Sequence, residues 1–121
     1  MNALILFAHG ARDARWAAPF EAVAEKVRAT CPGVLVTLSF LELMTPDLPG
    51  AVDQAVAAGC RRVDVLPLFL GTGGHVRRDL PLLLDALRTR HAGVEIRLHA
   101  PVGETPSVID AMARAAAAAL E

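Results

Sequence analysis

Cysteine is scarce in this sequence and forms no motif. Cys31 and Cys60 lie far apart, and neither belongs to a Cys-x-x-Cys pair. Cysteines at that close spacing are typical of redox and metal-binding motifs. We therefore interpret the two thiols as buried or incidental, which fits a cytoplasmic protein.

The sequence also lacks an excess of charge and a long apolar run. Its formal net charge is −1, and it has no basic run or RNA-binding motif, so we expect no nucleic-acid partner. Charges or prolines interrupt every apolar run before it reaches the roughly 18 residues of a membrane span. Residues 1–8 lack the basic start and cleavage site of a signal peptide and are expected to form a strand. We predict one cytoplasmic domain, residues 1–121, without membrane contact.

Apolar residues, by contrast, are abundant. They make up 54% of the chain, and the mean hydropathy is +0.41. Alanine accounts for much of this content. So high a value in a small domain nevertheless indicates apolar surface reserved for a partner subunit.

Strand and helix patterns alternate along the chain. Short apolar or β-branched runs predict strands, and apolar residues spaced i, i+3, i+4 between capping residues predict helices. The expected strands are residues 3–8, 34–40, 62–67 and 94–98, and the expected helices are residues 16–30, 48–58, 80–90 and 106–120. Four such units with short connections predict an α/β fold. It is a four-stranded parallel sheet in the order 2-1-3-4, with flavodoxin-like topology and helices on both faces.

Histidine follows two of the expected strands. His9 comes directly after the first strand, and His75 ends the glycine-rich loop 71–74 after the third, an apolar run that we expect to be buried on both faces. The next helix is expected to begin only at Leu80. Parallel strands bring both histidines to the carboxyl edge of the sheet, where ligands bind. One strand-end histidine is ordinarily a satisfied polar residue, but two in the same position indicate a site.

Two neutral imidazoles can hold a divalent ion or take up a proton near pH 7. They are too few for a closed structural metal site, which normally has four ligands, so an open, transient metal position is expected. Glu42, after the second strand, is either a third polar group at this edge or a solvated carboxylate. Flanking arginines are candidates for binding the carboxylates of a polyacid, although each alone is ordinarily a solvated charge: Arg12, Arg15, Arg77 and Arg78.

The loop Gly71-Thr72-Gly73-Gly74 is a weak match to a phosphate-binding loop. No lysine follows it, and the helix is expected to start well after the glycines rather than directly behind them. Glycines in such a loop instead let backbone amides approach the face or edge of a large flat ligand.

Three segments together resemble a known family. Residues 9–13, His-Gly-Ala-Arg-Asp, resemble the His-Gly-Ser-Arg-Asp opening of the CbiX-type sirohydrochlorin chelatases. Residues 40–43, Phe-Leu-Glu-Leu, and residues 67–81 resemble the second and third signatures, so the likeness covers essentially the whole chain in order. Ala11 replaces a serine that the family often has, and some members carry another residue at Glu42. Neither departure touches the histidines.

The resemblance implies half of the two-lobed class II chelatase fold, paired as a homodimer around a shared cavity. It implies a lyase of cobalamin or siroheme biosynthesis that inserts a divalent metal into sirohydrochlorin, with cobalt expected first and iron or nickel as alternatives. The metal is a substrate, and no permanently bound cofactor is expected. His9 would be the catalytic base and a metal ligand, and His75 the second metal ligand. The implied tetrapyrrole contacts are Thr45, Leu70, Gly71, Thr72, Gly73 and Gly74.

Two other functions stay open on the residues alone. A histidine and glycine after an N-terminal strand also open the histidine phosphatases, but those need an arginine directly before the histidine, where Ala8 stands. A non-catalytic module that binds a tetrapyrrole or a metal would carry the same histidines. Turnover of sirohydrochlorin with Co²⁺, as opposed to stoichiometric binding, separates the enzyme from the module.

Overall fold

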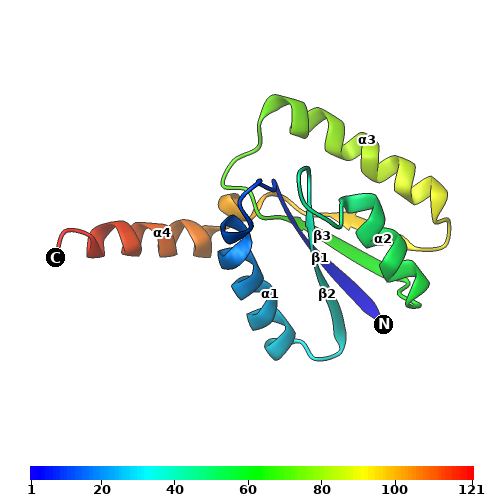
Figure 1. The fold of residues 1–121 in the computed structure, drawn as a ribbon, viewed down its shortest axis with the longest axis horizontal. Helices are drawn as coiled ribbons and strands as arrows, with labels where there is room; N and C mark the ends of the chain where they lie inside the picture. The colour runs from blue at the N-terminus through cyan, green and yellow to red at the C-terminus, as the bar shows by residue number, and fades with distance from the viewer.

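One parallel sheet organises the computed structural model, which describes all 121 residues (Figure 1). Its strands are β1 (Asn2–Ala8), β2 (Val34–Phe40), β3 (Arg62–Pro67) and β4 (Glu95–Leu98). They lie in the order β2-β1-β3-β4, and every neighbouring pair is parallel. The predicted α/β class and strand order are confirmed, and β2 and β3 have the predicted bounds.

Helices connect the strands as predicted, with shifts at their ends. They are α1 (Ala18–Thr30), α2 (Leu48–Ala57), α3 (Gly74–Arg90) and α4 (Pro106–Ala118), with 3-10 turns η1 (Ala14–Ala17) before α1 and η2 (Val102–Glu104) before α4. The predicted cap of the second helix is present, because the Asp47 carboxylate accepts a hydrogen bond from the Gly50 N–H at 2.9 Å. None of the helices combines the length and the apolar sequence needed to cross a bilayer.

The two faces of the sheet are covered unequally. Helices α2 and α3 pack on one face and form the main core, in which Val52 and Leu84 meet Ile5, Val63 and Val65. On the other face α1 packs over β1 and β2 around Leu6, Ala24 and Val36. The larger core therefore lies on the α2–α3 side.

The third helix begins earlier than predicted. α3 starts at Gly74 instead of Leu80, so Pro81 lies inside it and Asp79 does not cap it. Proline was interpreted as a helix start, but its ring here lies on the exposed side, while burial of Leu80 and Leu84 against the sheet favours the continuous helix. The consequence for the site is that His75 lies in the first turn of α3 and not in the loop.

The expectation that the third strand is buried on both faces is wrong. Along β3, Val63, Val65 and Pro67 are buried, whereas the alternating residues Asp64 and Leu66 are only partly covered. The partly covered face has no helix of its own above it at β3 and β4. The last helix, α4, extends away from the sheet and buries no residue (Figure 1).

Candidate functional site

His9 is the first residue beyond the carboxyl edge of β1. Its ring stacks on Phe69, with 4.2 Å between ring centroids and 26° between planes. Phe69 is itself buried and packs against Phe7 at 5.7 Å. The exposed imidazole thus rests on a buried aromatic pair that fixes its plane, while its nitrogens make no hydrogen bond within the chain. Sequence reasoning missed this support, because one phenylalanine in an apolar run gives no signal of its own.

Backbone bonds bring the loop after β2 against His9. The Glu42 N–H donates to the His9 carbonyl at 3.0 Å, and the Leu41 N–H donates to the Ala8 carbonyl at 2.8 Å. Gly10 has φ +96°, and a Cβ there would collide with the backbone oxygen of Glu42. Only glycine therefore permits this close approach, which places Glu42 beside His9.

His75 and Glu42 line the same hollow, of about 340 Å³. Asp79 lines it too, one turn after His75 on α3, and the remaining wall is apolar: Leu41, Val76, Leu80 and Leu83. Sequence reasoning interpreted Asp79 only as part of a helix start. The signal that would have found it is the i, i+4 spacing of His75 and Asp79, which is informative only when one helix includes both.

The candidate metal position is not a closed site within one chain. No three His, Cys, Asp or Glu side chains come close enough together to hold one ion. The hollow offers an imidazole and two carboxylates along its wall, with room between them. Such a lining suits brief contact with a hard or borderline divalent ion better than permanent binding.

The other two histidines have different surroundings. The Nε2 atom of His91 lies 2.7 Å from Asp53, and that of His99 lies 2.8 Å from Asp64. Burial raises the pKa of Asp64, but hydrogen bonds from His99 and Arg62 and the nearby charges outweigh this and hold it below its ordinary value. These two histidines are tied to carboxylates, whereas His9 and His75 have no such partner.

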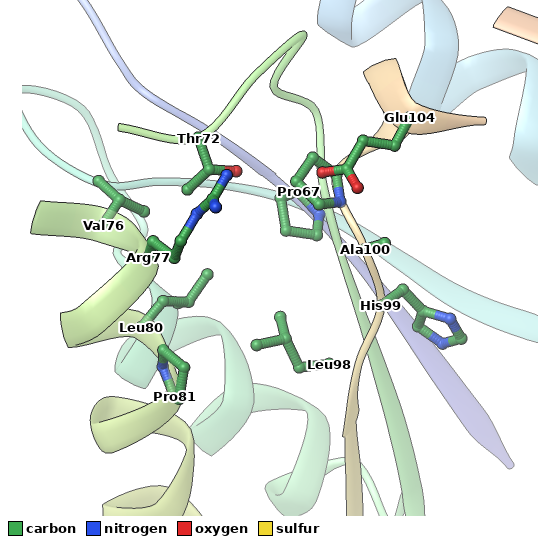
Figure 2. Close-up of a pocket in the computed structure, with 11 residues that line it drawn as sticks. Pro67, Thr72, Val76, Arg77, Leu80, Pro81, Leu98, His99, Ala100 and Glu104 are labelled. Carbon is green, nitrogen blue, oxygen red and sulfur yellow. The ribbon is translucent and has the colours of Figure 1, made fainter. Parts of the chain in front are cut away.

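The glycine-rich loop lies between two hollows. Leu70 is 69% exposed, and Gly71, Gly73 and Gly74 are exposed as well. Thr72 instead lines a second hollow of about 360 Å³, between α3 and the segment after β4 (Figure 2). Its hydroxyl is buried and has no hydrogen-bond partner. In Figure 2 the side chains of Thr72, Arg77 and Glu104 converge at one end of this hollow, while the His99 ring points away.

One premise of the phosphate-loop analysis is wrong. The helix α3 does begin directly behind the glycines, with Gly73 as its extended N-cap residue. The other premise stands, since no lysine follows. The loop therefore has the helix placement of a phosphate site without its lysine.

The remaining predicted residues are spread along the edge. Thr45 does not reach the His75 hollow; it lines a separate one between α1 and β2. Arg12 is exposed just after Gly10 and, like Arg77 and Arg78, forms no ion pair. Arg15 instead pairs with Asp13 at 2.9 Å, and its side-chain and backbone hydrogen bonds lower the pKa of Asp13.

Fold and site together define an open parallel α/β domain with histidines beyond the ends of its first and third strands. The family model of CbiX matches residues 3–119, so the chain belongs to the CbiX family. A protein of Methanocaldococcus jannaschii named sirohydrochlorin cobaltochelatase is 35% identical over 91 residues, 75% of this chain and 64% of that one. The chain spans about six-tenths of the length of the first curated relatives that it matches.

Solved structures agree with this family. The CbiX protein of Marinobacter aquaeolei VT8 superimposes with a TM-score of 0.84 and 36% identity, over 99% of this chain and 98% of that one. The sirohydrochlorin chelatase SirB of Bacillus subtilis subspecies spizizenii, in complex with cobalt, gives a TM-score of 0.80 and 26% identity. This chain covers 93% of its own length but 48% of SirB, so it matches about half of that chelatase.

Proposed function

We propose that this chain is a short sirohydrochlorin chelatase that inserts a divalent metal ion into the metal-free tetrapyrrole. The observation that carries the proposal is that Glu42 is bonded through its backbone to His9 and lines the same hollow as His75, and that neither imidazole has a hydrogen-bond partner in the chain. The names of the relatives supply the substrate class.

His9 is the proposed base. Metal insertion forms bonds from the ion to ring nitrogens and releases two pyrrole protons, which a neutral imidazole can accept near pH 7. Phe69 holds the His9 ring from one side, so its edge stays available to a flat substrate. A homodimer has two copies of His9, one for each proton.

The wall of the 340 Å³ hollow is the proposed entry position of the metal substrate. His75 supplies a ring nitrogen, and Glu42 and Asp79 supply carboxylate oxygens. Few and widely placed ligands hold an ion loosely, which suits an ion that must leave for the macrocycle. Cobalt is the metal that we propose first, and iron and nickel are the alternatives.

The loop 70–74 is the proposed tetrapyrrole contact. Cβ atoms added at Gly71, Gly73 or Gly74 would meet nothing within 4 Å, and none of the three has a positive φ. The folded chain therefore does not itself require glycine there, whereas a ligand lying close against the backbone would. The unpartnered Thr72 hydroxyl and the unpaired Arg77 are suited to hydrogen-bond a peripheral carboxylate.

A homodimer completes this proposal. One copy presents a single edge with open hollows, whereas cofactor-sized ligands are normally buried over most of their surface. Two copies with facing carboxyl edges would enclose the macrocycle. The apolar content of the chain leaves surface for such a contact.

The test is a spectral assay of insertion into sirohydrochlorin with Co²⁺, Fe²⁺ and Ni²⁺ in turn. His9→Ala should abolish insertion, at least a 100-fold loss for a missing general base. His75→Ala should weaken metal use more than tetrapyrrole binding. The matched control is His91→Ala, because His91 contacts Asp53 outside this site and should leave the rate per folded molecule unchanged.

Two results would contradict the proposal. Near-parental rates in both His9→Ala and His75→Ala would make these histidines structural. Binding of one sirohydrochlorin per site with no turnover by any metal would identify the non-catalytic module instead.

A further inference from the structure

Leu43 has a backbone conformation that leucine rarely adopts. It follows Glu42 in the loop after β2 and has φ +66°, in the left-handed region that favours glycine and asparagine. Every other residue with a positive φ in this chain is a glycine. Leu43 is also 59% exposed. Leucine is therefore unfavourable here on two counts, because its backbone is strained and its apolar side chain lies in water.

The surrounding loop explains how this conformation persists, but not why the residue is leucine. The Glu42 N–H donates to the His9 carbonyl at 3.0 Å, and the Phe40 N–H donates to the Pro46 carbonyl at 3.0 Å. These bonds hold the loop on both sides of Leu43. Glycine or asparagine would adopt the same backbone with less strain. Leu43 belongs to none of the apolar clusters of the fold, so no packing within the chain compensates for the strain.

A second exposed leucine lies on the other side of His9. Leu70 is 69% exposed and follows Phe69, on which the His9 ring stacks. Because β1 lies between β2 and β3, His9 lies between the loops that carry Leu43 and Leu70. Neighbouring strands are about 4.8 Å apart, so these two loops leave the sheet about 10 Å from each other. That separation is comparable to the width of a ring of four pyrroles.

We propose that Leu43 is a substrate-binding residue whose side chain packs on the face of the tetrapyrrole, while Leu70 packs on it across His9. The inference rests on the function proposed above and adds a contact outside the loop 70–74. Binding removes the exposed side chain of Leu43 from water, and this burial contributes to affinity. Backbone strain of this kind is found at binding sites, where a side chain is kept for its ligand.

The groups along this edge match a macrocycle better than they match a second copy of the chain. The polar residues His9 and Glu42 lie between the two leucines, so the apolar surface is interrupted. The core of a protein–protein contact is normally depleted of charged groups. A tetrapyrrole instead has apolar rings around a polar centre of nitrogens, which places polar groups where His9 and Glu42 lie.

The test is Leu43→Asn, with binding of metal-free sirohydrochlorin measured by absorbance titration. Asparagine tolerates the left-handed backbone but removes the apolar contact. The Kd should therefore rise about tenfold, while Tm should rise by about 3 °C because the strain is relieved. Leu43→Gly, which removes the side chain altogether, should weaken binding to a similar extent. A variant that is more stable but binds less tightly separates loss of contact from damage to the fold.

Two further variants serve as controls. Leu43→Met keeps an apolar side chain on the strained backbone and should retain the parental Kd within about twofold. Leu82→Gln removes a leucine that is 67% exposed on α3 and lines no hollow with His75, so it should leave the Kd unchanged.

Three results would overturn the proposal. The first is a parental Kd in Leu43→Asn, which would make the strain a property of the loop alone. The second is an equal rise in Kd in Leu43→Asn and Leu82→Gln, which would show a general effect of lost apolar surface. The third is a lower mass of Leu43→Asn than of the parent in light scattering, which would assign the Leu43 contact to a second copy.

These readouts need no metal and so are separate from insertion. If Leu43→Asn weakens binding and no metal is inserted by the parent, the contact stands and the proposed activity falls. If the parent inserts metal and Leu43→Asn binds sirohydrochlorin as the parent does, the activity stands and the contact falls.

Discussion

At the scale of single residues, the four histidines divide by what they contact. His91 and His99 each meet a carboxylate, so their ring nitrogens already have partners. His9 meets only the face of Phe69, and His75 only the wall of an open hollow. The ring nitrogens of His9 and His75 can therefore bind an ion or a proton without first breaking a hydrogen bond, whereas those of His91 and His99 cannot. This difference makes His9 and His75 the candidate functional residues.

Asp79 is the one candidate metal-contacting residue that only the structure identifies. Asp79→Asn removes a charge from the hollow that it shares with His75, so the KM for the metal should rise about tenfold while sirohydrochlorin binding stays unchanged. Insertion rates measured against metal concentration test this. Asp85→Asn is the control, since Asp85 lies on the same helix but pairs with Arg88 at 2.8 Å. An unchanged KM for all three metals would place Asp79 outside the metal path.

The glycines of the loop give a second residue-scale prediction. Gly73 has φ −68°, which alanine adopts without strain, and no atom of the chain lies within 4 Å of an added Cβ. Gly73→Ala should therefore change the free energy of unfolding by less than about 1 kcal/mol, because the lower entropy of the unfolded chain is offset by the loss of a glycine at the N-cap of α3. We expect sirohydrochlorin affinity to fall about tenfold, or about 1.4 kcal/mol, if the ligand lies against this backbone.

Thermal melts and an absorbance titration measure the two effects of Gly73→Ala separately. Gly33→Ala is the matched control, because an added Cβ is equally unhindered there and Gly33 precedes β2, at the other edge of the sheet. It should stabilise the fold without changing affinity. Equal affinity in Gly73→Ala and the parent would show that the loop does not touch the macrocycle.

At the scale of elements, the strands were more predictable than the helix starts. β2 and β3 were correctly bounded because apolar runs between turn residues mark strands locally. The start of α3 was predicted wrongly. Gly73 and Gly74 have no helix propensity that would mark it, and Pro81 suggested a helix start that lies well inside the helix. His9 and His75 could be placed at one edge from topology alone. Asp79 and Phe69 could not, since their roles depend on the true helix start and on packing.

Asp64 on β3 connects β3, β4 and the segment after β4 on the partly covered face of the sheet. It accepts hydrogen bonds from His99 at 2.8 Å and Arg62 at 2.9 Å, and Arg97 lies 3.3 Å away. Asp64→Asn should lower the free energy of unfolding by about 1–3 kcal/mol at pH 7, because donors lose a charged acceptor. Thermal melts of the parent and the variant measure this difference.

The pH dependence of that difference follows from the lowered pKa of Asp64. Its stabilisation is present above the unfolded-state pKa, near 3.9, and is lost as pH falls through the lower folded-state pKa. The gap between parent and Asp64→Asn should therefore narrow below about pH 4. A gap that is constant from pH 7 to pH 3 would show that the charge on Asp64 contributes nothing.

At the scale of the whole molecule, one copy of the chain is incompletely covered. Helices α1, α2 and α3 cover the sheet, whereas α4 packs on neither face of it. The hollow beside His75 is open to solvent. The hydropathy of the sequence indicated surface reserved for a partner but not where it lies. The segment before α4 packs closely against the body, because a Cβ on Gly103 would meet the backbone of Leu70, and no local sequence pattern reports this contact.

If two copies complete each other, the stability of the fold depends on protein concentration. Unfolding of a dimer to two unfolded chains is opposed by mass action, so each tenfold rise in concentration adds about 1.4 kcal/mol per dimer and should raise Tm by about 3 °C. Calorimetry at three concentrations measures this slope. A Tm that does not change with protein concentration would contradict the proposed homodimer.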